Sequence, residues 1–598
     1  MCGFIGEISK EDVDLDLLDK CNENLVCRGP DEKKSLNTTT PNGFNLNMIF
    51  NRLAILDLTK QGSQPMKNIQ NDILMFNGEI FNHIELRNKL EDDGVKFFSN
   101  NSDSEVVLNG LSHYGINFIE KLIGQFAIFF YSNSNNKCYL VRDRLAQKPL
   151  FYNYEKNSIK FSSNLKSLIQ LNKTYSLDED ALYEYIYTGV VRSPNTIINN
   201  IKKLHPGELI EINLDDNISL NKDKYWSPNN FIDSKQFDEK KFLDLLIDAY
   251  SIRSKADVEI SNLLSGGIDS TALIKINELS KNRSNQNTFS VSIKDSEYDE
   301  SFWFNQVVEK YKTNHKTEIL PKNISIDIIN DSINLFDEPY ADPSTVPSYI
   351  IYKTISNYYK VAISGDGGDE LLGGYTRIYN SINRKKLNEN ILKFLFKIFP
   401  YFLGTGYFLS KKSQNFNNSY ISNFHDKKIS SLFKKNNNFK INFDTISNSD
   451  YKTAILFEYC YYLPEMMMLK VDRTSMASSL EVRSPYVDHR LVEYILSTDI
   501  EYKSIEDAKK ILKNLIADDM GQKFINRKKQ GFVFDIKDWV FQNKKIIVDE
   551  VINSDVHNFV KIDKFKRLFY IKSRINALRI WKIYFLSIYL KSLKNYNE

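Results

Sequence analysis

The sequence has 598 residues and a formal net charge of +3, with 42% hydrophobic and 26% charged side chains. This length exceeds one ordinary domain and predicts roughly two to four. The composition is typical of a globular protein, and the near-neutral charge gives no reason to expect nucleic acid or an acidic membrane as a partner. The five scattered cysteines and the absence of a basic or apolar leader favour a cytoplasmic protein without disulfides or a zinc site.

Short β-type runs dominate the first part of the chain, to about residue 170, and include GFIGEI, ILMFNGEIFN and QFAIFFYS. Turn residues separate them at short intervals, which predicts stacked antiparallel sheets. Helical patterns at 84–92 and 104–114 lie between these runs. We place a first domain at 1–212, followed by a linker rich in Asn, Asp and Lys at 213–229.

Residues 230–598 form the second predicted domain, where helix-like segments alternate with apolar strands such as NLLS, TFSVSI and KVAIS. This alternation predicts a parallel, doubly wound α/β sheet. Beyond about residue 450 the pattern is mostly helical, and the Asn- and Lys-rich segment 411–448 is interpreted as a mobile surface insert. The apolar stretch 392–409 contains two lysines, one proline and two glycines. A membrane-spanning helix needs roughly 20 residues with few charges, so we interpret this stretch as a buried helical hairpin.

Cys2 directly follows the initiator methionine. We expect Met1 to be removed, because Cys2 and the glycine after it are small, and removal leaves one residue with both a thiol and a free α-amine. The amine has a reference pKa of about 7.7–8.0 and can act as a general base, while a thiolate is an effective acyl acceptor. Position alone also allows a chance cysteine at the start of a strand, so the neighbouring motifs decide between the two interpretations.

Five motifs follow Cys2 in order: CRGPD (27–31), RLAILD (52–57), GSQPM (62–66), NGEIFNH (77–83) and SDSEVVL (102–108). With RDRLAQKPLFY at 142–152, they resemble the class II glutamine amidotransferase domain. The resemblance implies an α+β N-terminal-nucleophile sandwich, with two antiparallel sheets between helices, and a glutamyl thioester on Cys2. The chain departs from the family at Cys27, where histidine is frequent, and we expect this change to tune activity rather than abolish it.

The same resemblance implies a glutamine site. Arg52 resembles the clamp on the substrate's α-carboxylate, because a guanidinium can bind both carboxylate oxygens. Glu79 and Asp103 resemble the acids that hold its α-ammonium. Asn77 and the backbone N–H of Gly78 resemble the donors that stabilise the tetrahedral intermediate. A plain turn is the alternative interpretation of NGE taken alone.

The segment NLLSGGIDSTAL (262–273) predicts a buried strand, a glycine turn and the start of a helix. Backbone N–H groups at a helix N-terminus favour an anion, and the glycines permit its close approach. The pattern differs from the GxxxxGK[ST] phosphate loop. It resembles the pyrophosphate loop of enzymes that cleave ATP to AMP and pyrophosphate, while an ordinary strand-to-helix turn is the alternative for this segment alone.

Further motifs resemble the synthetase domain of the asparagine synthetase family: FSVSIKDSEYDES (289–301), DEPYADPSTVP (337–347), SGDGGDELLGGY (364–375), VDRTSMASSLEVRSPYVDHR (471–490) and RKKQGF (527–532). The two resemblances cover almost the whole chain except about residues 380–450. They imply a sheet of ATP-pyrophosphatase type with helical additions, and ATP and Mg²⁺ as cofactors. The residues implied to bind ATP are Leu263, Ser265, Gly266, Gly267, Asp269, Ser270, Val291, Ser364 and Gly365.

Asp269 and Asp369 are implied to hold Mg²⁺, a hard cation that prefers oxygen ligands. The resemblance further implies one acid that shapes the acyl-adenylate step and two cations that neutralise charge on the phosphates: Asp366, Arg473 and Lys529. Lys528 is the alternative to Lys529, one residue away in register.

The resemblance as a whole implies that aspartate is adenylated and that ammonia from glutamine passes between the domains to displace AMP. The implied partners are the small molecules glutamine, aspartate and ATP, without nucleic acid or membrane, and a homodimer is compatible with the resemblance. Another carboxylate, such as a sugar acid or a peptide carboxylate, would use the same machinery. A non-catalytic relative is the alternative from a different class, and the intact Cys2, Arg52, Asp103 and SGGIDS argue against it.

Overall fold

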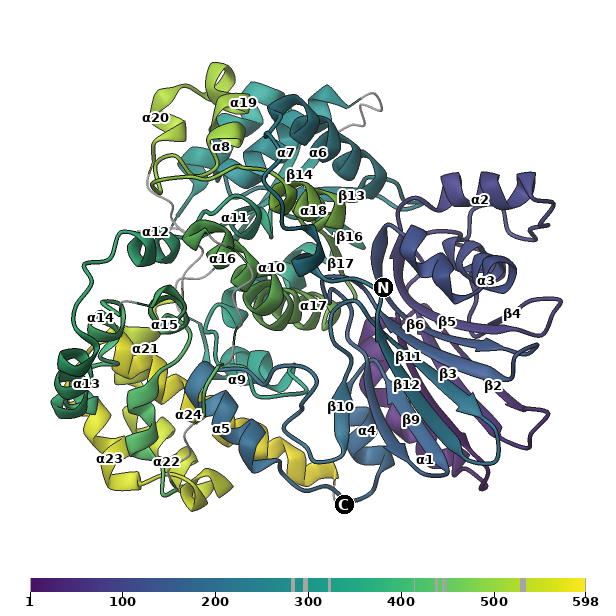
Figure 1. Cartoon of the computed structure of the whole chain (residues 1–598), viewed down its shortest axis with the longest axis horizontal. Helices are drawn as coiled ribbons and strands as arrows, with labels where there is room; N and C mark the ends of the chain where they lie inside the picture. The colour runs from purple at the N-terminus through teal and green to yellow at the C-terminus, as the bar shows by residue number, and fades with distance from the viewer. Residues whose placement is uncertain are drawn as a thin grey trace.

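The computed structural model describes residues 2–280, 286–293, 299–320, 324–413, 415–435, 439–441, 443, 447, 449–527 and 534–596. These residues form a pair of antiparallel sheets, a parallel sheet and a helical body (Figure 1). In that view the antiparallel pair lies at the right, the parallel sheet above the centre and the helical body at the lower left.

Each of the two N-terminal sheets contains six strands, and all neighbouring strands are antiparallel, as predicted. The first sheet has the order β10-β8-β9-β1-β3-β2, with β1 (Gly3–Ser9), β2 (Glu32–Thr39), β3 (Asn45–Arg52), β8 (Phe151–Glu155), β9 (Ser158–Ser162) and β10 (Ile201–Lys203). The second has the order β12-β11-β7-β6-β5-β4, with β4 (Met66–Lys67), β5 (Ile73–Ile80), β6 (Gly124–Ser132), β7 (Lys137–Arg142), β11 (Glu208–Leu214) and β12 (Ile218–Lys224).

Side-chain alternation along the strands builds the core between these sheets. Phe4 and Ile8 of β1 share one buried cluster with Ile73 and Met75 of β5, because alternate side chains of a strand point to the same face. The intervening Ile5 belongs to a separate cluster beneath helices. Helices therefore cover both outer faces of the sandwich, as the sequence predicts: α1 (Leu15–Asn22) and α4 (Leu165–Leu171) on the first sheet, α2 (His83–Asp92) and α3 (Asp103–Tyr114) on the second.

The boundary between the domains differs from the predicted linker at 213–229. β12 pairs with β11 from Ile218 to Lys224, so these residues belong to the second sheet. β12 is an edge strand, and edge strands carry charged side chains that face water. The composition of this segment therefore reflects an exposed sheet edge rather than a flexible connection.

The second domain contains a five-stranded sheet in which all neighbouring strands are parallel, as predicted. Its order is β15-β14-β13-β16-β17, with β13 (Ile260–Leu263), β14 (Asn287–Ile293), β15 (Asn314–Leu320), β16 (Val361–Ile363) and β17 (Glu481–Arg483). The strand order reverses between β13 and β16, and ligands bind at the carboxyl ends of strands at such a switch point. The helices around this sheet include α6 (Glu239–Arg253), α7 (Ile268–Leu279), α8 (Ser301–Tyr311), α10 (Thr345–Ile355), α11 (Gly368–Leu371), α16 (Asp450–Phe457), α17 (Met468–Met476), α18 (His489–Ser497), α19 (Lys510–Met520) and α20 (Gln522–Ile525).

The helical body surrounds α24 (Arg574–Leu593), whose side chains are buried on nearly all sides. It also contacts the first domain, because the hydroxyl of Tyr185 in α5 (Glu179–Thr188) donates to the Lys582 carbonyl at 2.8 Å. The predicted helical character beyond about residue 450 is confirmed. The helical body also includes α9 (Ile326–Asn334), α13 (Glu389–Ile398), α14 (Tyr407–Ser410), α21 (Ile536–Gln542), α22 (Lys544–Asn553) and α23 (Ile562–Arg567). Two further helices, α12 (Thr376–Ile382) and α15 (Phe416–Ile421), bury apolar side chains in the core around the parallel sheet.

Two segments differ from the predicted burial. Within 411–448, predicted as a surface insert, α15 buries Phe416 and Tyr420 in the core of the second domain, while part of the segment lies outside the described residues. The stretch 392–409 does form a helical hairpin, α13 and α14, but of its apolar side chains only Leu392 and Leu409 are buried, and five are exposed: Phe394, Ile398, Phe402, Leu403 and Phe408. In the described part of the chain, no helix is long and apolar enough to cross a bilayer.

A chain of buried ion pairs joins the two domains. Arg28 of the first domain donates to both carboxylate oxygens of Asp472 at 2.9 Å, and Arg473 donates to the same carboxylate at 2.6 Å. Arg473 also binds Asp337 through two nitrogens, at 2.7 and 2.9 Å. All four side chains are nearly inaccessible to water, so each charge depends on its neighbours.

The substitution Asp472→Asn keeps the size of the side chain at the centre of these ion pairs and removes its charge. We expect the free energy of unfolding to fall by about 3–5 kcal/mol, because Arg28 then faces no counter-charge in the interior. Urea unfolding measures the loss. The matched control, Glu179→Gln, breaks the exposed pair with Lys435 and should change stability little. Similar small effects in both variants would contradict an interface held by buried charge.

Candidate active sites

Cys2 lies at the start of β1, between β3 and β9, and only 7% of its surface is exposed. Its backbone nitrogen donates to Asn77 Oδ1 at 3.1 Å, and its Sγ lies 4.0 Å from the Leu53 carbonyl oxygen. Burial raises the pKa of the Cys2 thiol. Forming the thiolate therefore requires a base close by, and the predicted α-amine of the same residue is such a group. Met1, whose removal is predicted, lies outside the described residues.

Asn77 places a hydrogen-bond donor beside Cys2. Its side chain is fully buried on β5, and its Nδ2 has no partner among the described residues. Buried amide donors are nearly always paired, so an unpaired one beside Cys2 is suited to a ligand oxygen. Residue 78, which follows Asn77, must be glycine, because a Cβ on Gly78 would lie 2.0 Å from the Gln125 carbonyl oxygen.

Arg52, at the end of β3, is held by the turn that follows it. Its Nη1 donates to the Thr59 carbonyl at 2.7 Å, and its Nη2 donates to the Asp57 carbonyl. Glu32 lies 3.5 Å from Nη1. A guanidinium has five N–H donors, so these contacts fix the group and still leave donors for a substrate carboxylate.

The predicted acids Glu79 and Asp103 belong to a cluster that includes two residues of the second domain. Arg483 Nη2 lies 3.3 Å from Glu79 Oε1, and Arg483 Nε donates to Glu481 at 2.6 Å. Burial raises the pKa of Asp103, and it raises the pKa of Glu79 well above its usual range although Arg483 opposes it. Burial acts in the same direction on Glu481, but Arg483 and nearby cations lower its pKa to about 2. Glu79 and Glu481 thus share the Arg483 guanidinium, while Asp103 accepts a hydrogen bond from the Ile80 nitrogen at 3.0 Å. Three buried carboxylates with one guanidinium among them suit a second cation such as a substrate ammonium.

Glu481 and Arg483 are functional candidates that the sequence analysis does not single out. They lie on β17 within the motif VDRTSMASSLEVRSPYVDHR, two residues apart and therefore on one face of the strand. Strand alternation could have paired them. It could not indicate that this face meets the first domain beside Glu79.

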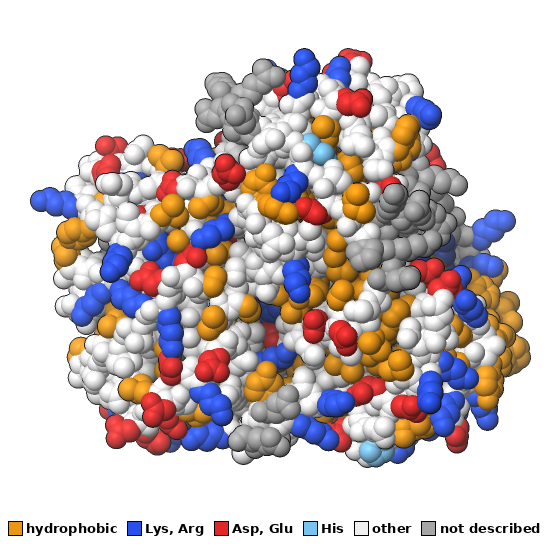
Figure 2. All heavy atoms as spheres, turned by 180° about the vertical axis from the view of Figure 1, so that it is seen from behind, with side chains coloured by type: hydrophobic (Ala, Val, Ile, Leu, Met, Phe, Trp, Pro, Cys, Tyr) orange, Lys and Arg blue, Asp and Glu red, His pale blue; other side chains and the backbone are white. Residues whose placement is uncertain are grey.

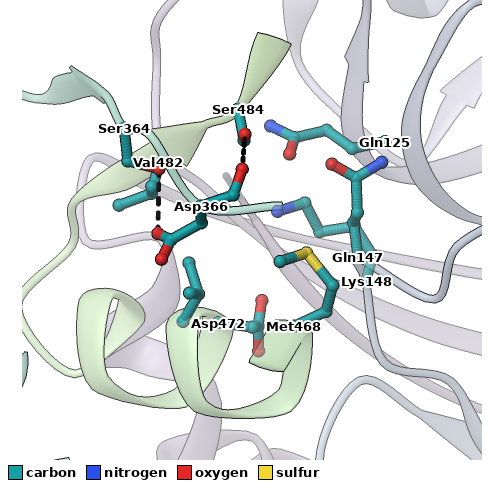
Figure 3. A pocket seen from close by; sticks show the side chains of 10 residues that line it. Gln125, Gln147, Lys148, Ser364, Asp366, Met468, Asp472, Val482 and Ser484 are labelled. Atoms are coloured by element: carbon teal, nitrogen blue, oxygen red, sulfur yellow. Dashed lines mark hydrogen bonds between the residues drawn. The ribbon is translucent and has the colours of Figure 1, made fainter. Parts of the chain in front are cut away.

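A small cavity separates the two candidate sites, and its walls come from both domains (Figure 3). Its volume is about 10 Å³, close to the space of one water molecule. Lys148, one of the lining residues from the first domain, is 2% exposed. Burial lowers the pKa of Lys148, with Asp472 opposing the shift. The residues that line the cavity are Gln125, Gln147, Lys148, Ser364, Asp366, Met468, Val471, Asp472, Val482 and Ser484.

The glycine loop after β13 leads into α7, as predicted. No side chain caps the start of α7 at Gly267, so the first backbone N–H groups remain available to an anion. Gly267 N donates to Ser265 Oγ at 3.2 Å, and Ser265 Oγ lies 3.2 Å from Ser270 Oγ. Gly266 has a φ of +69°, and a Cβ there would lie 2.6 Å from the Phe304 nitrogen. Sterics therefore require glycine at this turn.

A pocket of about 1000 Å³ opens over the carboxyl ends of β13 and β16. This volume is at the upper end of the range of roughly 300–1000 Å³ that is usual for small-molecule sites. The pocket gathers residues that are far apart in sequence, which a parallel sheet with its loops at one edge explains. Eight of the nine residues predicted to bind ATP line it: Leu263, Ser265, Gly267, Asp269, Ser270, Val291, Ser364 and Gly365.

The two predicted metal ligands, Asp269 and Asp369, converge on Lys509. The Lys509 ammonium lies 2.6 Å from Asp269 Oδ2 and 2.5 Å from Asp369 Oδ1. The two acids raise the pKa of Lys509 despite its burial. Carboxylate oxygens that already hold a cation between them fit Mg²⁺, which prefers hard oxygen ligands. No motif of the sequence analysis includes Lys509.

Asp366 lies where the pocket and the small cavity meet, and it lines both. Its Oδ2 accepts a hydrogen bond from Ser364 Oγ at 2.9 Å, and its carbonyl accepts one from Ser484 Oγ. The predicted cation Arg473 does not line this pocket and belongs to the buried ion pairs between the domains. Lys529 and Lys528 lie outside the described residues, whereas their neighbour Arg527 lines the pocket.

The chain matches two family models, asparagine synthase over residues 241–590 and the glutamine amidotransferase domain over 1–226. The chain belongs to the asparagine synthase family. Asparagine synthetase [glutamine-hydrolyzing] 1 of Bacillus subtilis is 27% identical, with 90% of this chain and 88% of the relative covered. Putative asparagine synthetase [glutamine-hydrolyzing] 2 of Methanocaldococcus jannaschii is 30% identical, with 66% of this chain and 79% of the relative covered. The solved "allosteric regulatory enzyme of purine biosynthesis" aligns at 13% identity over 53% of this chain and 80% of that chain, with a low TM-score of 0.30.

This member of the asparagine synthase family is accordingly an enzyme, an ATP-dependent amidoligase that takes nitrogen from glutamine. Its fold combines the N-terminal-nucleophile sandwich with the parallel-sheet synthetase domain.

The raised pKa values of Glu79 and Asp103 predict pH-dependent glutamine binding. A carboxyl with a raised pKa is protonated at higher pH, and pairing with the substrate's α-ammonium requires the ionised form. We expect the Kd of glutamine for a Cys2→Ala variant, which binds without reacting, to rise by up to about tenfold per pH unit as the pH falls through the raised pKa values of these carboxyls. Calorimetric titration measures it.

The matched control combines Glu79→Gln with Asp103→Asn in the Cys2→Ala background. It should bind glutamine weakly and with little dependence on pH, because neither of the carboxyls with a raised pKa remains to titrate. A Kd that is constant with pH while both acids are present would argue against their role.

Proposed function

We propose that this asparagine synthase family member converts aspartate to asparagine, with glutamine as the nitrogen donor and with ATP cleaved to AMP and pyrophosphate. The observation that carries the proposal is the cavity between the two sites, which shares Ser364 and Asp366 with the large pocket. The names of the relatives in Bacillus subtilis and Methanocaldococcus jannaschii support aspartate as the acceptor.

The first half-reaction releases ammonia at Cys2. The freed α-amine takes the thiol proton, and Sγ attacks the side-chain carbonyl carbon of glutamine. Asn77 Nδ2 and the Gly78 N–H donate to the oxygen that becomes negative, while Arg52, Glu79 and Asp103 hold the α-groups of the substrate. The carbon–nitrogen bond breaks as the amine returns the proton to the leaving nitrogen. Water then cleaves the thioester and gives glutamate.

The second half-reaction activates aspartate in the large pocket. The N-terminus of α7 and the hydroxyls of Ser265 and Ser270 bind phosphate oxygens, and Asp269 and Asp369 would hold Mg²⁺. Bound Mg²⁺ would supply charge neutralisation at the phosphates. The β-carboxylate oxygen of aspartate attacks the α-phosphorus of ATP, and pyrophosphate leaves. Ammonia then attacks the acyl carbon, and AMP leaves with the bonding electron pair.

Glu370 favours an acceptor that carries an ammonium group. It lines the pocket, burial raises its pKa to about 7, and Tyr375 donates to it at 2.5 Å. An α-ammonium beside it would stabilise the ionised carboxylate. An amino acid supplies such a group and a simple sugar acid does not, which favours aspartate over the alternative acceptors.

The small cavity supports a dry route for ammonia. It has room for about one molecule of that size, and Met468, Val471 and Val482 give it an apolar wall. The cationic form of Lys148 would repel an ammonium ion and admit neutral ammonia. The nitrogen would then reach Asp366 as the nucleophile that the second reaction needs.

ATP–pyrophosphate exchange tests the synthetase half. Wild-type protein with MgATP should exchange pyrophosphate best with aspartate, and AMP should be the nucleotide product. Asp269→Asn keeps the size and removes the charge, so we expect exchange to fall by about 10²–10³-fold while glutamine hydrolysis persists. ADP as the product would refute the ATP-pyrophosphatase mechanism. Exchange with another acid but not with aspartate would refute the acceptor alone.

Val482→Phe tests the route, because the larger side chain fills the cavity between the sites. We expect glutamine hydrolysis and synthesis from added ammonia to continue, while the ratio of glutamate formed to asparagine formed rises well above one. Val482→Ala, which enlarges the cavity, is the matched control and should keep the ratio near that of the wild type. A tightly coupled Val482→Phe enzyme would place the ammonia route elsewhere.

A further inference from the structure

A hairpin of the helical body exposes an apolar face that the proposed chemistry does not use. Ile391, Phe394 and Ile398 of α13 recur at helical spacing and are all more than half exposed. The hairpin, residues 385–412, carries further exposed apolar side chains beyond α13: Leu387, Phe402, Leu403 and Phe408. Figure 2 shows hydrophobic side chains gathered at its right-hand edge, over this part of the helical body. Monomers rarely expose so many adjoining apolar groups without a binding role.

The same hairpin is strongly basic. It contains six lysines and one acid, Glu389, which accepts a hydrogen bond from Ser413. Lys393 and Lys397 each immediately precede an exposed apolar residue of α13, so they flank its apolar face. The six lysines are Lys385, Lys386, Lys393, Lys397, Lys411 and Lys412.

The inner side of the hairpin is attached firmly to the protein. Asn576 of α24 donates to the Phe402 carbonyl at 3.0 Å, and Arg579 donates to the Tyr401 carbonyl. At its base, the Leu387 nitrogen donates to the Lys412 carbonyl at 3.0 Å. The exposed side chains are therefore presented on a fixed support.

We propose that this hairpin binds the surface of an anionic lipid membrane. An apolar helix face flanked by lysines matches both layers of such a surface, the anionic headgroups and the acyl boundary below them. The ten residues of α13 span about 15 Å, which suits a helix lying in the plane of the interface rather than one that crosses it. A second copy of the chain is less suitable, because a symmetric contact would bring the lysines of two hairpins together.

Co-sedimentation of the full-length protein with vesicles tests the proposal. We expect binding to vesicles of phosphatidylcholine mixed with phosphatidylglycerol, weaker binding to phosphatidylcholine alone, and loss of binding as salt is raised. Phe394→Ser with Ile398→Ser should weaken binding by at least about tenfold, because two large apolar side chains no longer enter the boundary. Lys393→Gln with Lys397→Gln should weaken it by about tenfold on anionic vesicles only.

The matched control is Ile69→Ser with Phe98→Ser, which removes two side chains of similar exposure from the first domain. It should bind vesicles like the wild type, and all variants should keep wild-type glutaminase and exchange rates. Wild-type protein that fails to bind anionic vesicles, or hairpin variants that bind like the control, would overturn the proposal. A hairpin variant that only converts a dimer to a monomer in light scattering would identify the occupant as a second copy instead.

Discussion

The buried ion pair between Arg28 and Asp472 is the contact on which the arrangement of the two sites depends. Arg28 Nε also donates to the Cys2 carbonyl at 3.0 Å, so one guanidinium binds both Cys2 and the second domain. Through Arg473, the same network reaches Asp337, which accepts a hydrogen bond from the Leu165 nitrogen at the start of α4. Because charges in the interior tolerate little separation, the domains cannot shift without disturbing Cys2.

Both candidate sites contain several acidic side chains, and in each a cation of the protein lies where the proposed reaction would place a cationic group. Arg483 is shared between Glu79 and Glu481 beside the proposed glutamine site. Lys509 bridges Asp269 and Asp369 in the nucleotide pocket. Arg483 lowers the pKa of Glu481 and opposes the raised pKa of Glu79, so it offsets part of the acidic charge before a ligand arrives.

The sequence predicted the sites to the extent that local patterns determine them. The motif order singled out Cys2 and Asn77, which lie in contact, and the strand-turn-helix pattern placed Asp269 at the carboxyl edge of a parallel sheet, where the loop with Asp369 must also lie. Lys509 is distant from both and carries no motif, so only folding could bring it there. Arg473 has the charge of a phosphate-binding group, but the orientation of its helix directs it to Asp337.

The same limit explains the errors in burial. Apolar composition indicates that a segment prefers to leave water, but not which neighbour is available to cover it. The hairpin 385–412 is apolar on two sides, and the helical body covers one of them. The polar residues of β12 likewise fit a linker or an exposed sheet edge, and only its pairing with β11 distinguishes the two.

The size of the cavity between the domains has a consequence for timing. A space for one small molecule holds no reserve, so the proposed enzyme could not release several ammonia molecules in advance and use them later. The slower of the two reactions would then limit the rate of both. Each glutamine hydrolysed before an acyl-adenylate has formed would be lost without yielding product. Efficient use of glutamine nitrogen would therefore require the two sites to be coupled across the domain interface. The strand that carries Glu481 and Arg483 would be the coupling element, because it contributes to both sites.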